Sequence, residues 1–186
     1  MRKVVLVCAL SAAIAVMLAG SQYLNRGSAS EGAQGMVILM RHADATTGRD
    51  SPDNLKLDDC ATQRNLNDNG RRQAVRLGQY FRTGGAVIGK IIASPMCRAS
   101  ETARLLDIGP VELSRDFVDL TNNKAIADQL LGKQRDIIAR WRGPGALIIV
   151  THGSNIRALT TVDLDPAEML VVDSTSRRWR LVSFSE

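Results

Sequence analysis

The chain has 186 residues, of which 24 are Lys or Arg and 19 are Asp or Glu, and its formal net charge is +5. A hydrophobic fraction of 45% beside 23% charged residues is typical of a packed globular domain and excludes a collagen-like, coiled-coil or wholly disordered chain. Two histidines and three cysteines are too few for a zinc-finger pattern or a three-histidine zinc site. Any chemistry that needs an imidazole therefore depends on His42 and His152.

The N-terminal segment has the order of a secretory signal. Arg2 and Lys3 precede an uncharged apolar run over residues 4–20, which is slightly shorter than the ~20 apolar residues of a transmembrane helix. We expect residues 1–30 to be a signal peptide or signal anchor with a linker, and residues 31–186 to form the folded domain. The expected location is periplasmic or secreted, with an anchor in the inner membrane only if the segment stays uncleaved.

Removal of residues 1–30 on export would change both the net charge of the chain and the number of its cysteines. Residues 1–30 hold three basic residues and no acidic one, so 21 basic and 19 acidic residues remain. This balance, with few aromatic residues, gives no basic stacking surface, and we expect no nucleic-acid partner. Loss of Cys8 leaves Cys60 and Cys97, which form either a disulfide in an oxidising compartment or two separate buried thiols.

The rest of the chain alternates strand-like and helix-like segments. Short apolar runs predict strands over residues 36–40, 90–93, 146–151, 169–172 and 179–184. Apolar residues at helical spacing predict helices over residues 67–82, 97–106 and 123–141. The polar stretch 43–66 is a long irregular segment of the kind that forms binding loops. The alternation predicts an α/β fold, a three-layer α/β/α sandwich around a mainly parallel sheet.

Chemically notable residues follow three of these strands. Arg41 and His42 end the first, Arg98 lies in the first turn of the helix after the second, and His152 follows the third. Because ligands bind beyond the carboxyl ends of parallel strands, where helix N-termini offer free N–H groups, we expect these four side chains to surround one anion. A guanidinium fits phosphate oxygens, so the expected occupant is a phosphoryl group. One imidazole would attack phosphorus while the other cations stabilise the oxygens, with no cofactor and no metal.

Four segments then resemble, in order, the motifs of the histidine phosphatase superfamily, which has the phosphoglycerate-mutase-like fold. They are Leu39-Met-Arg-His-Ala43, the stretch 66–78, Ser94-Pro-Met-Cys-Arg-Ala-Ser-Glu-Thr-Ala103 and Val150-Thr-His-Gly-Ser-Asn-Ile-Arg157. The resemblance implies His42 as the phosphorylated nucleophile, Arg41 and Arg98 as substrate-binding phosphate clamps, and His152 as the second histidine of the pocket. The Arg-His-Ala form is more similar to small phosphohistidine phosphatases and to exported members that act on lipopolysaccharide core phosphates.

The proton donor of that family is not evident in this chain. His152 is followed by Gly153, so the His-Asp pair of the acid phosphatase branch is absent. Where the mutase-like branch has a glutamate, this chain offers Asp116 and Asp119, and Asp44 lies beside the nucleophile. The donor is therefore one of three aspartates or no side chain.

The expected activity is a metal-independent phosphohydrolase that works through a phosphohistidine. Its substrate would be a small molecule or a glycan phosphate, such as an envelope phosphosugar, or a phosphohistidine. The alternative is a non-catalytic phosphate- or phosphosugar-binding protein of the same fold. The sequence leaves the substrate and the oligomeric state open.

Overall fold

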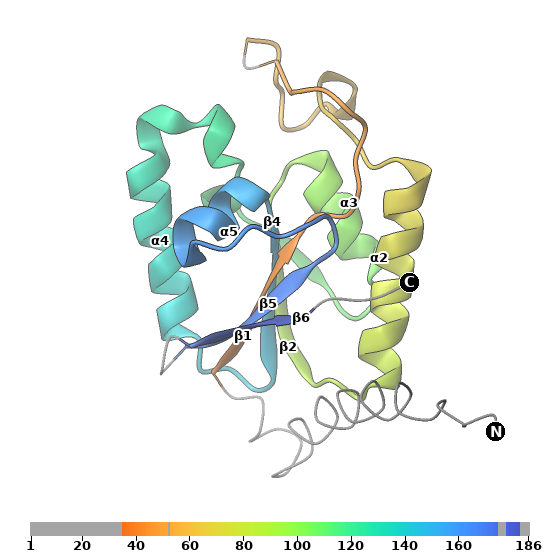
Figure 1. The fold of residues 1–186 in the computed structure, drawn as a ribbon, viewed down its shortest axis with the longest axis vertical. Helices are drawn as coiled ribbons and strands as arrows, with labels where there is room; N and C mark the ends of the chain where they lie inside the picture. The colour runs from red at the N-terminus through yellow and green to blue at the C-terminus, as the bar shows by residue number, and fades with distance from the viewer. Residues whose placement is uncertain (1–34, 52, 175–177, 183–186) are drawn as a thin grey trace, which may run out of the picture.

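The computed structural model describes residues 35–51, 53–174 and 178–182. The expected signal segment and Cys8 lie outside the described residues, as do the last two residues of the final predicted strand. Among the helices within those ranges, none is long and apolar enough to cross a membrane. Figure 1 shows a central sheet with helices against both of its faces.

Among the described residues, the sheet contains six strands in the order β3-β2-β4-β1-β5-β6. Their bounds are Met36–Arg41 (β1), Ile88–Ala93 (β2), Val111–Leu113 (β3), Ala146–Thr151 (β4), Met169–Asp173 (β5) and Trp179–Val182 (β6). The pairs β1–β4, β2–β4 and β2–β3 are parallel, whereas β5 pairs antiparallel with β1 and with β6. All five predicted strands are present, and the sheet is mainly parallel as expected. The short edge strand β3 was not predicted, because three residues are too few to show a pattern.

Within the part of the chain that the structure describes, four α-helices cover the sheet. Their bounds are Asp68–Thr83 (α2), Cys97–Leu105 (α3), Ala127–Arg140 (α4) and Gly153–Thr160 (α5). Asn67 caps α2 as its residue type predicts, since its side-chain oxygen accepts the N–H of Gly70 at 2.8 Å. The third predicted helix begins later than expected, because residues 124–126 form a separate 3-10 turn before α4.

The apolar strands are buried on both faces, which produces the three layers. Ile38 and Met40 of β1 belong to the core under α2 and α3, whereas Val37 and Leu39 belong to the core under α4 and α5. Figure 1 shows the same division of the helices. Burial on both faces explains why the strands are continuous apolar runs rather than alternating ones. The predicted α/β/α sandwich is confirmed.

A disulfide joins the long irregular stretch to the start of α3. Cys60 and Cys97 are bonded, with 5.7 Å between their Cα atoms and a sequence separation of 37. Of the two alternatives left open by the sequence, the structure has the disulfide. The bond ties the segment after β1 to the residue that immediately precedes Arg98.

Helices α2 and α3 meet at a glycine, which gives a prediction about stability. A Cβ atom at Gly78 would lie 1.9 Å from the carbonyl oxygen of Leu106, so the backbones must separate to admit it. We expect Gly78→Ala to lower the free energy of unfolding by about 1–3 kcal/mol, measured by urea unfolding.

Gly132 in α4 is the matched control, because it is exposed and a Cβ there would meet nothing within 4 Å. Gly132→Ala should stabilise the protein by about 0.5–1 kcal/mol through helix propensity. Equal effects of the two substitutions would contradict the close approach of the helices.

Candidate active site

The two histidines lie together at the carboxyl edge of the sheet. Strand β4 lies between β1 and β2. The N–H of His42 donates to Thr151 and that of Ser94 donates to Val150, each at 2.9 Å, so the residues after β1 and β2 are bonded to the end of β4. The rings of His42 and His152 are 5.3 Å apart between centroids. The expected meeting of the two imidazoles is therefore present.

His42 has one proton, and the structure places it on Nδ1. That nitrogen is 2.8 Å from the carbonyl oxygen of Ala43, which only accepts hydrogen bonds. The Nε–H of Arg98 donates to the other nitrogen, Nε2, at 3.1 Å. Burial, followed by the positive charge of Arg98, lowers the pKa of His42 to about 3. At neutral pH His42 is thus an uncharged ring with an unprotonated Nε2, which is the state that a nucleophilic imidazole needs.

Arg98 is the centre of the polar network, although its side chain is only 1% exposed. Besides His42, it donates from Nη1 to Oδ2 of Asp50 and from Nη2 to Oδ2 of Asp119, both at 3.0 Å. Two carboxylates therefore compensate one buried positive charge, as a buried ion needs. Asp119 was a candidate from the sequence, whereas Asp50 was not predicted.

Arg41 lies at the end of β1, beside the N-terminus of α5. Its Nη1 donates to the carbonyl oxygen of Leu164 at 2.6 Å. Its Nε is buried and has no hydrogen-bond partner among the described residues. A Cβ atom at Gly153 would lie 3.6 Å from this Nε, an ordinary van der Waals contact, so the guanidinium lies directly beside the first residue of α5. Arg41 therefore belongs to the same edge of the sheet as the histidines.

His152 precedes the first residue of α5 and is 1% exposed. Its Nε2 is 2.9 Å from Oγ of Ser94, and its Nδ1 is 3.8 Å from Oδ2 of Asp119, beyond hydrogen-bond range. Burial, and next the positive charge of Arg98, hold the pKa of His152 well below its usual value. The sequence led us to expect another cation here, but the folded environment makes His152 neutral.

Of the three aspartates considered as proton donors, only Asp119 contacts the residues gathered at this edge. Asp44 instead accepts from Asn67 at 2.9 Å, at the start of α2. Asp116 pairs with Lys133 at 3.2 Å. Asp119 accepts from Arg98 and is the acidic side chain nearest to Nδ1 of His152.

Asp119 is held as a carboxylate. Burial by itself would raise its pKa, but the Ser154 hydroxyl, the Thr121 N–H and the positive charge of Arg98 stabilise the anion, and the pKa of Asp119 lies below its usual value. The hydroxyl of Ser154 donates to Oδ1 at 2.7 Å. At neutral pH Asp119 is therefore a proton acceptor rather than a donor.

Two residues of the network, Asp50 and Ser94, were not predicted from the sequence. Asp50 lies in the polar stretch after β1, where its carboxylate also accepts the N–H of Arg64 at 2.8 Å. Ser94 was recognised only as the first residue of the third motif, and no role was predicted for it. In the sequence, Asp50 is distinguished only as an acidic residue in a polar loop. Ser94 is distinguished only as a hydroxyl residue directly after a buried strand.

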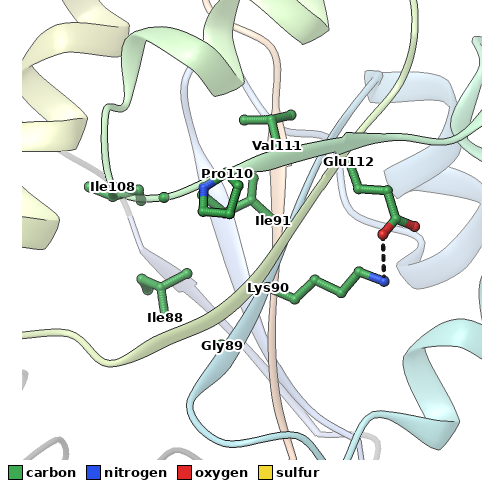
Figure 2. A pocket seen from close by; sticks show the side chains of 9 residues that line it. Ile88, Gly89, Lys90, Ile91, Ile108, Pro110, Val111 and Glu112 are labelled. Carbon is green, nitrogen blue, oxygen red and sulfur yellow. Dashed lines mark ion pairs between the residues drawn. The ribbon is translucent and has the colours of Figure 1, made fainter.

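A separate hollow lies at the other end of β2, between β2 and β3 (Figure 2). Ile88, Ile108 and Pro110 line it, and Lys90 pairs with Glu112 at 2.8 Å beside it. None of the residues expected at the phosphate site lines this hollow. Within the described ranges there is also no group of three or more His, Cys, Asp and Glu side chains placed to hold a metal ion.

Comparisons with known proteins agree with the motifs. Residues 37–125 match the family model of the histidine phosphatase superfamily (branch 1). No curated protein sequence gives a significant match. The resemblance expected from the motifs is therefore confirmed at the level of the superfamily, whereas the exported Arg-His-Ala subtype stays a prediction.

Solved structures show the same fold. The protein histidine phosphatase SixA, complexed with tungstate, is 16% identical, with 80% of this chain and 94% of that chain covered and a TM-score of 0.53. A mycobacterial glucosyl-3-phosphoglycerate phosphatase, complexed with VO3, is 16% identical, with 82% and 99% covered and a TM-score of 0.56. At this identity the likeness establishes the phosphoglycerate-mutase-like fold.

The neutral histidines predict a loss of stability in mild acid. The pKa of His42 is about 3 in the folded protein, whereas an unperturbed histidine has a pKa of 6.5, so in mild acid the unfolded chain binds a proton that the folded chain does not. The stabilising contribution is complete above pH 6.5 and is lost as the pH falls toward 3. We expect His42 alone to lower the free energy of unfolding by about 2 kcal/mol between pH 7 and pH 5, with His152 acting in the same direction.

Urea unfolding at the two pH values measures this loss, and His42→Asn should reduce it. A free energy of unfolding that does not change over this range would contradict neutral burial of the histidines.

The paired carboxylates predict a second effect on stability. Asp50→Asn leaves the charge of Arg98 with Asp119 as its only anion, so we expect a loss of about 3 kcal/mol in urea unfolding at pH 7. Asp58→Asn removes the same charge from an exposed position of the same segment and should change the stability by less than about 0.5 kcal/mol. If the two variants were equally stable, Asp50 would not compensate the buried guanidinium.

Proposed function

Since this chain belongs to the histidine phosphatase superfamily through residues 37–125, we propose that it is a phosphohydrolase that works through a phosphohistidine at His42. The observation that carries the proposal is the state of His42, whose Nε2 lone pair faces the buried guanidinium of Arg98 at 3.1 Å. His152 and Arg41 complete the proposed site, with Arg41 and Arg98 binding the phosphate.

In the first step, Nε2 of His42 attacks phosphorus. The new N–P bond forms as the bond from phosphorus to the leaving group breaks, and the leaving group departs with the electron pair. Arg98 turns its Nε–H from Nε2 to a phosphoryl oxygen, and the N–H of His152 and the guanidinium of Arg41 bind the remaining oxygens. These donors stabilise the charge that grows on the oxygens in the transition state.

In the second step, water displaces His42 from phosphorus. The new P–O bond forms, the N–P bond breaks, and inorganic phosphate is released. Asp119 is the proposed acceptor of the water's proton, because its carboxylate is ionised at neutral pH and contacts Arg98 at 3.0 Å. The proposal needs no metal and no cofactor.

The state of Asp119 also bears on the substrate. A leaving group as basic as an alkoxide needs a proton in the first step, yet this aspartate is ionised in the free protein. The leaving group of a phosphohistidine or of an acid-labile phosphoester needs less protonation in that step. An envelope phosphosugar is a candidate as well, on the condition that the bound substrate brings the proton that its leaving group needs. The complexes of the similar structures with tungstate and VO3, both oxyanions, support an oxyanion as the occupant.

The remaining proposals rest on the sequence. We place the protein in the periplasm or outside the cell, with membrane attachment only if residues 1–30 stay uncleaved. Its partner is a small-molecule or glycan phosphate, and nucleic acid is not a partner.

The proposal predicts that His42→Asn abolishes turnover. Removing the nucleophile should lower kcat on an aryl phosphate by at least about 10³-fold, because the covalent route is lost. Brief reaction of the parent protein with a radiolabelled substrate should leave label on His42 that is stable in alkali and lost in acid, as a phosphorus–nitrogen bond is.

Asp58→Asn, at an exposed position, is the activity control, and thermal unfolding checks that each variant is folded. If folded His42→Asn retained the parental rate, the phosphohistidine mechanism would be wrong. Binding of inorganic phosphate by the parent protein without turnover of aryl phosphates, phosphosugars or phosphohistidine peptides would favour the non-catalytic binding protein instead.

A further inference from the structure

Ser94 contacts the second histidine from a fully buried position. It follows β2 directly, its relative exposure is 0%, and its Oγ lies 2.9 Å from Nε2 of His152. The same oxygen accepts the N–H of Met96 at 3.3 Å. These contacts account for the oxygen of the hydroxyl group, and the partner of its proton follows from the acceptors around it.

The hydroxyl proton has a single acceptor available. Among the described residues, Nε2 of His152 is the one acceptor within hydrogen-bond range of Oγ of Ser94. If Nε2 carried a proton and donated to Ser94, the serine proton would be buried without a partner. Such a group costs about 1–3 kcal/mol. The arrangement that satisfies both groups has Ser94 donating to an unprotonated Nε2.

The surroundings of the other nitrogen of the ring favour the same assignment. Nδ1 of His152 faces Oδ2 of Asp119 at 3.8 Å. Asp119 is an anion fixed by Ser154 and Arg98. A lone pair on Nδ1 would repel that carboxylate, whereas an N–H would be attracted to it. Nδ1 also has no hydrogen-bond partner among the described residues, so its proton is not committed elsewhere.

We propose that Ser94 is a positioning residue that fixes His152 as the Nδ1–H tautomer and so keeps an uncommitted N–H donor directed into the site. This inference rests on the proposed function, because the donor's role is to bind a phosphoryl oxygen during transfer to His42. A preorganised donor of this kind acts mainly in the transition state. The loss of Ser94 should therefore lower kcat and leave KM nearly unchanged.

Nitrogen NMR spectroscopy of the imidazoles tests the assignment without any substrate. The chain has two histidines, so His42→Asn leaves only the signals of His152. We expect Nδ1 of His152 to carry the proton in this variant and in the parent protein. Ser94→Ala should convert His152 to a mixture of tautomers, and Ser94→Thr, which retains the hydroxyl, should restore the single form.

Kinetics with an aryl phosphate give the second measurement. Ser94→Ala should lower kcat by about 10–100-fold, less than the loss of a whole oxyanion donor, and Ser94→Thr should recover most of it. Ser100→Ala is the matched control, because Ser100 is also a buried serine but donates to Cys97 within its own helix. It should leave both the tautomer and kcat unchanged.

A proton on Nε2 of His152 in the parent protein would overturn the inference, whether or not any variant folds. A Ser94→Ala protein with an unchanged tautomer or an unchanged kcat would overturn it as well. If His152 were the Nδ1–H tautomer but the His42→Asn variant kept full activity, the role of Ser94 would be supported and the phosphohistidine mechanism would be refuted. The two proposals can therefore fail separately.

Discussion

The rest of the site depends on one buried positive charge, the guanidinium of Arg98. Removed from water, it needs anions, and Asp50 and Asp119 supply them at 3.0 Å each. The same charge lowers the pKa of both histidines, after burial itself, and so keeps both rings neutral. A residue expected only to bind a ligand therefore also fixes the protonation of its neighbours and holds the segment after β1 against the sheet.

The sequence predicts the residues whose positions follow from local structure. Arg41, His42 and His152 each end or follow a buried strand, and Arg98 lies in the first turn of a helix. The parallel arrangement of β1, β2 and β4 then brings them to one edge. The strands themselves could be recognised because both of their faces are buried, which leaves an uninterrupted apolar run.

The partners of those residues could not be predicted in the same way. Asp50 lies 48 residues from Arg98 in the chain, and Ser94 lies 58 residues from His152. Several aspartates in the same polar stretch carry the same local signal, and only the folded chain shows which one is buried. For the same reason, the sequence could not decide whether Cys60 and Cys97 are bonded, because a disulfide requires two segments that are far apart in the chain to lie close together. The charge of His152 was misjudged, because burial is a property of the fold rather than of the motif.

The contact between Arg98 and His42 links substrate binding to the release of the nucleophile. In the free protein the Nε–H of Arg98 is bonded to Nε2 of His42, so the lone pair that would attack phosphorus is occupied. A guanidinium that grips phosphate through Nε and a neighbouring nitrogen must withdraw that hydrogen from the imidazole. On the proposed reaction, a phosphoryl oxygen replaces Nε2 as the acceptor, and the same exchange frees Nε2 beside phosphorus. The nucleophile is thus exposed when phosphate is bound, while Asp50 and Asp119 compensate the charge of the guanidinium.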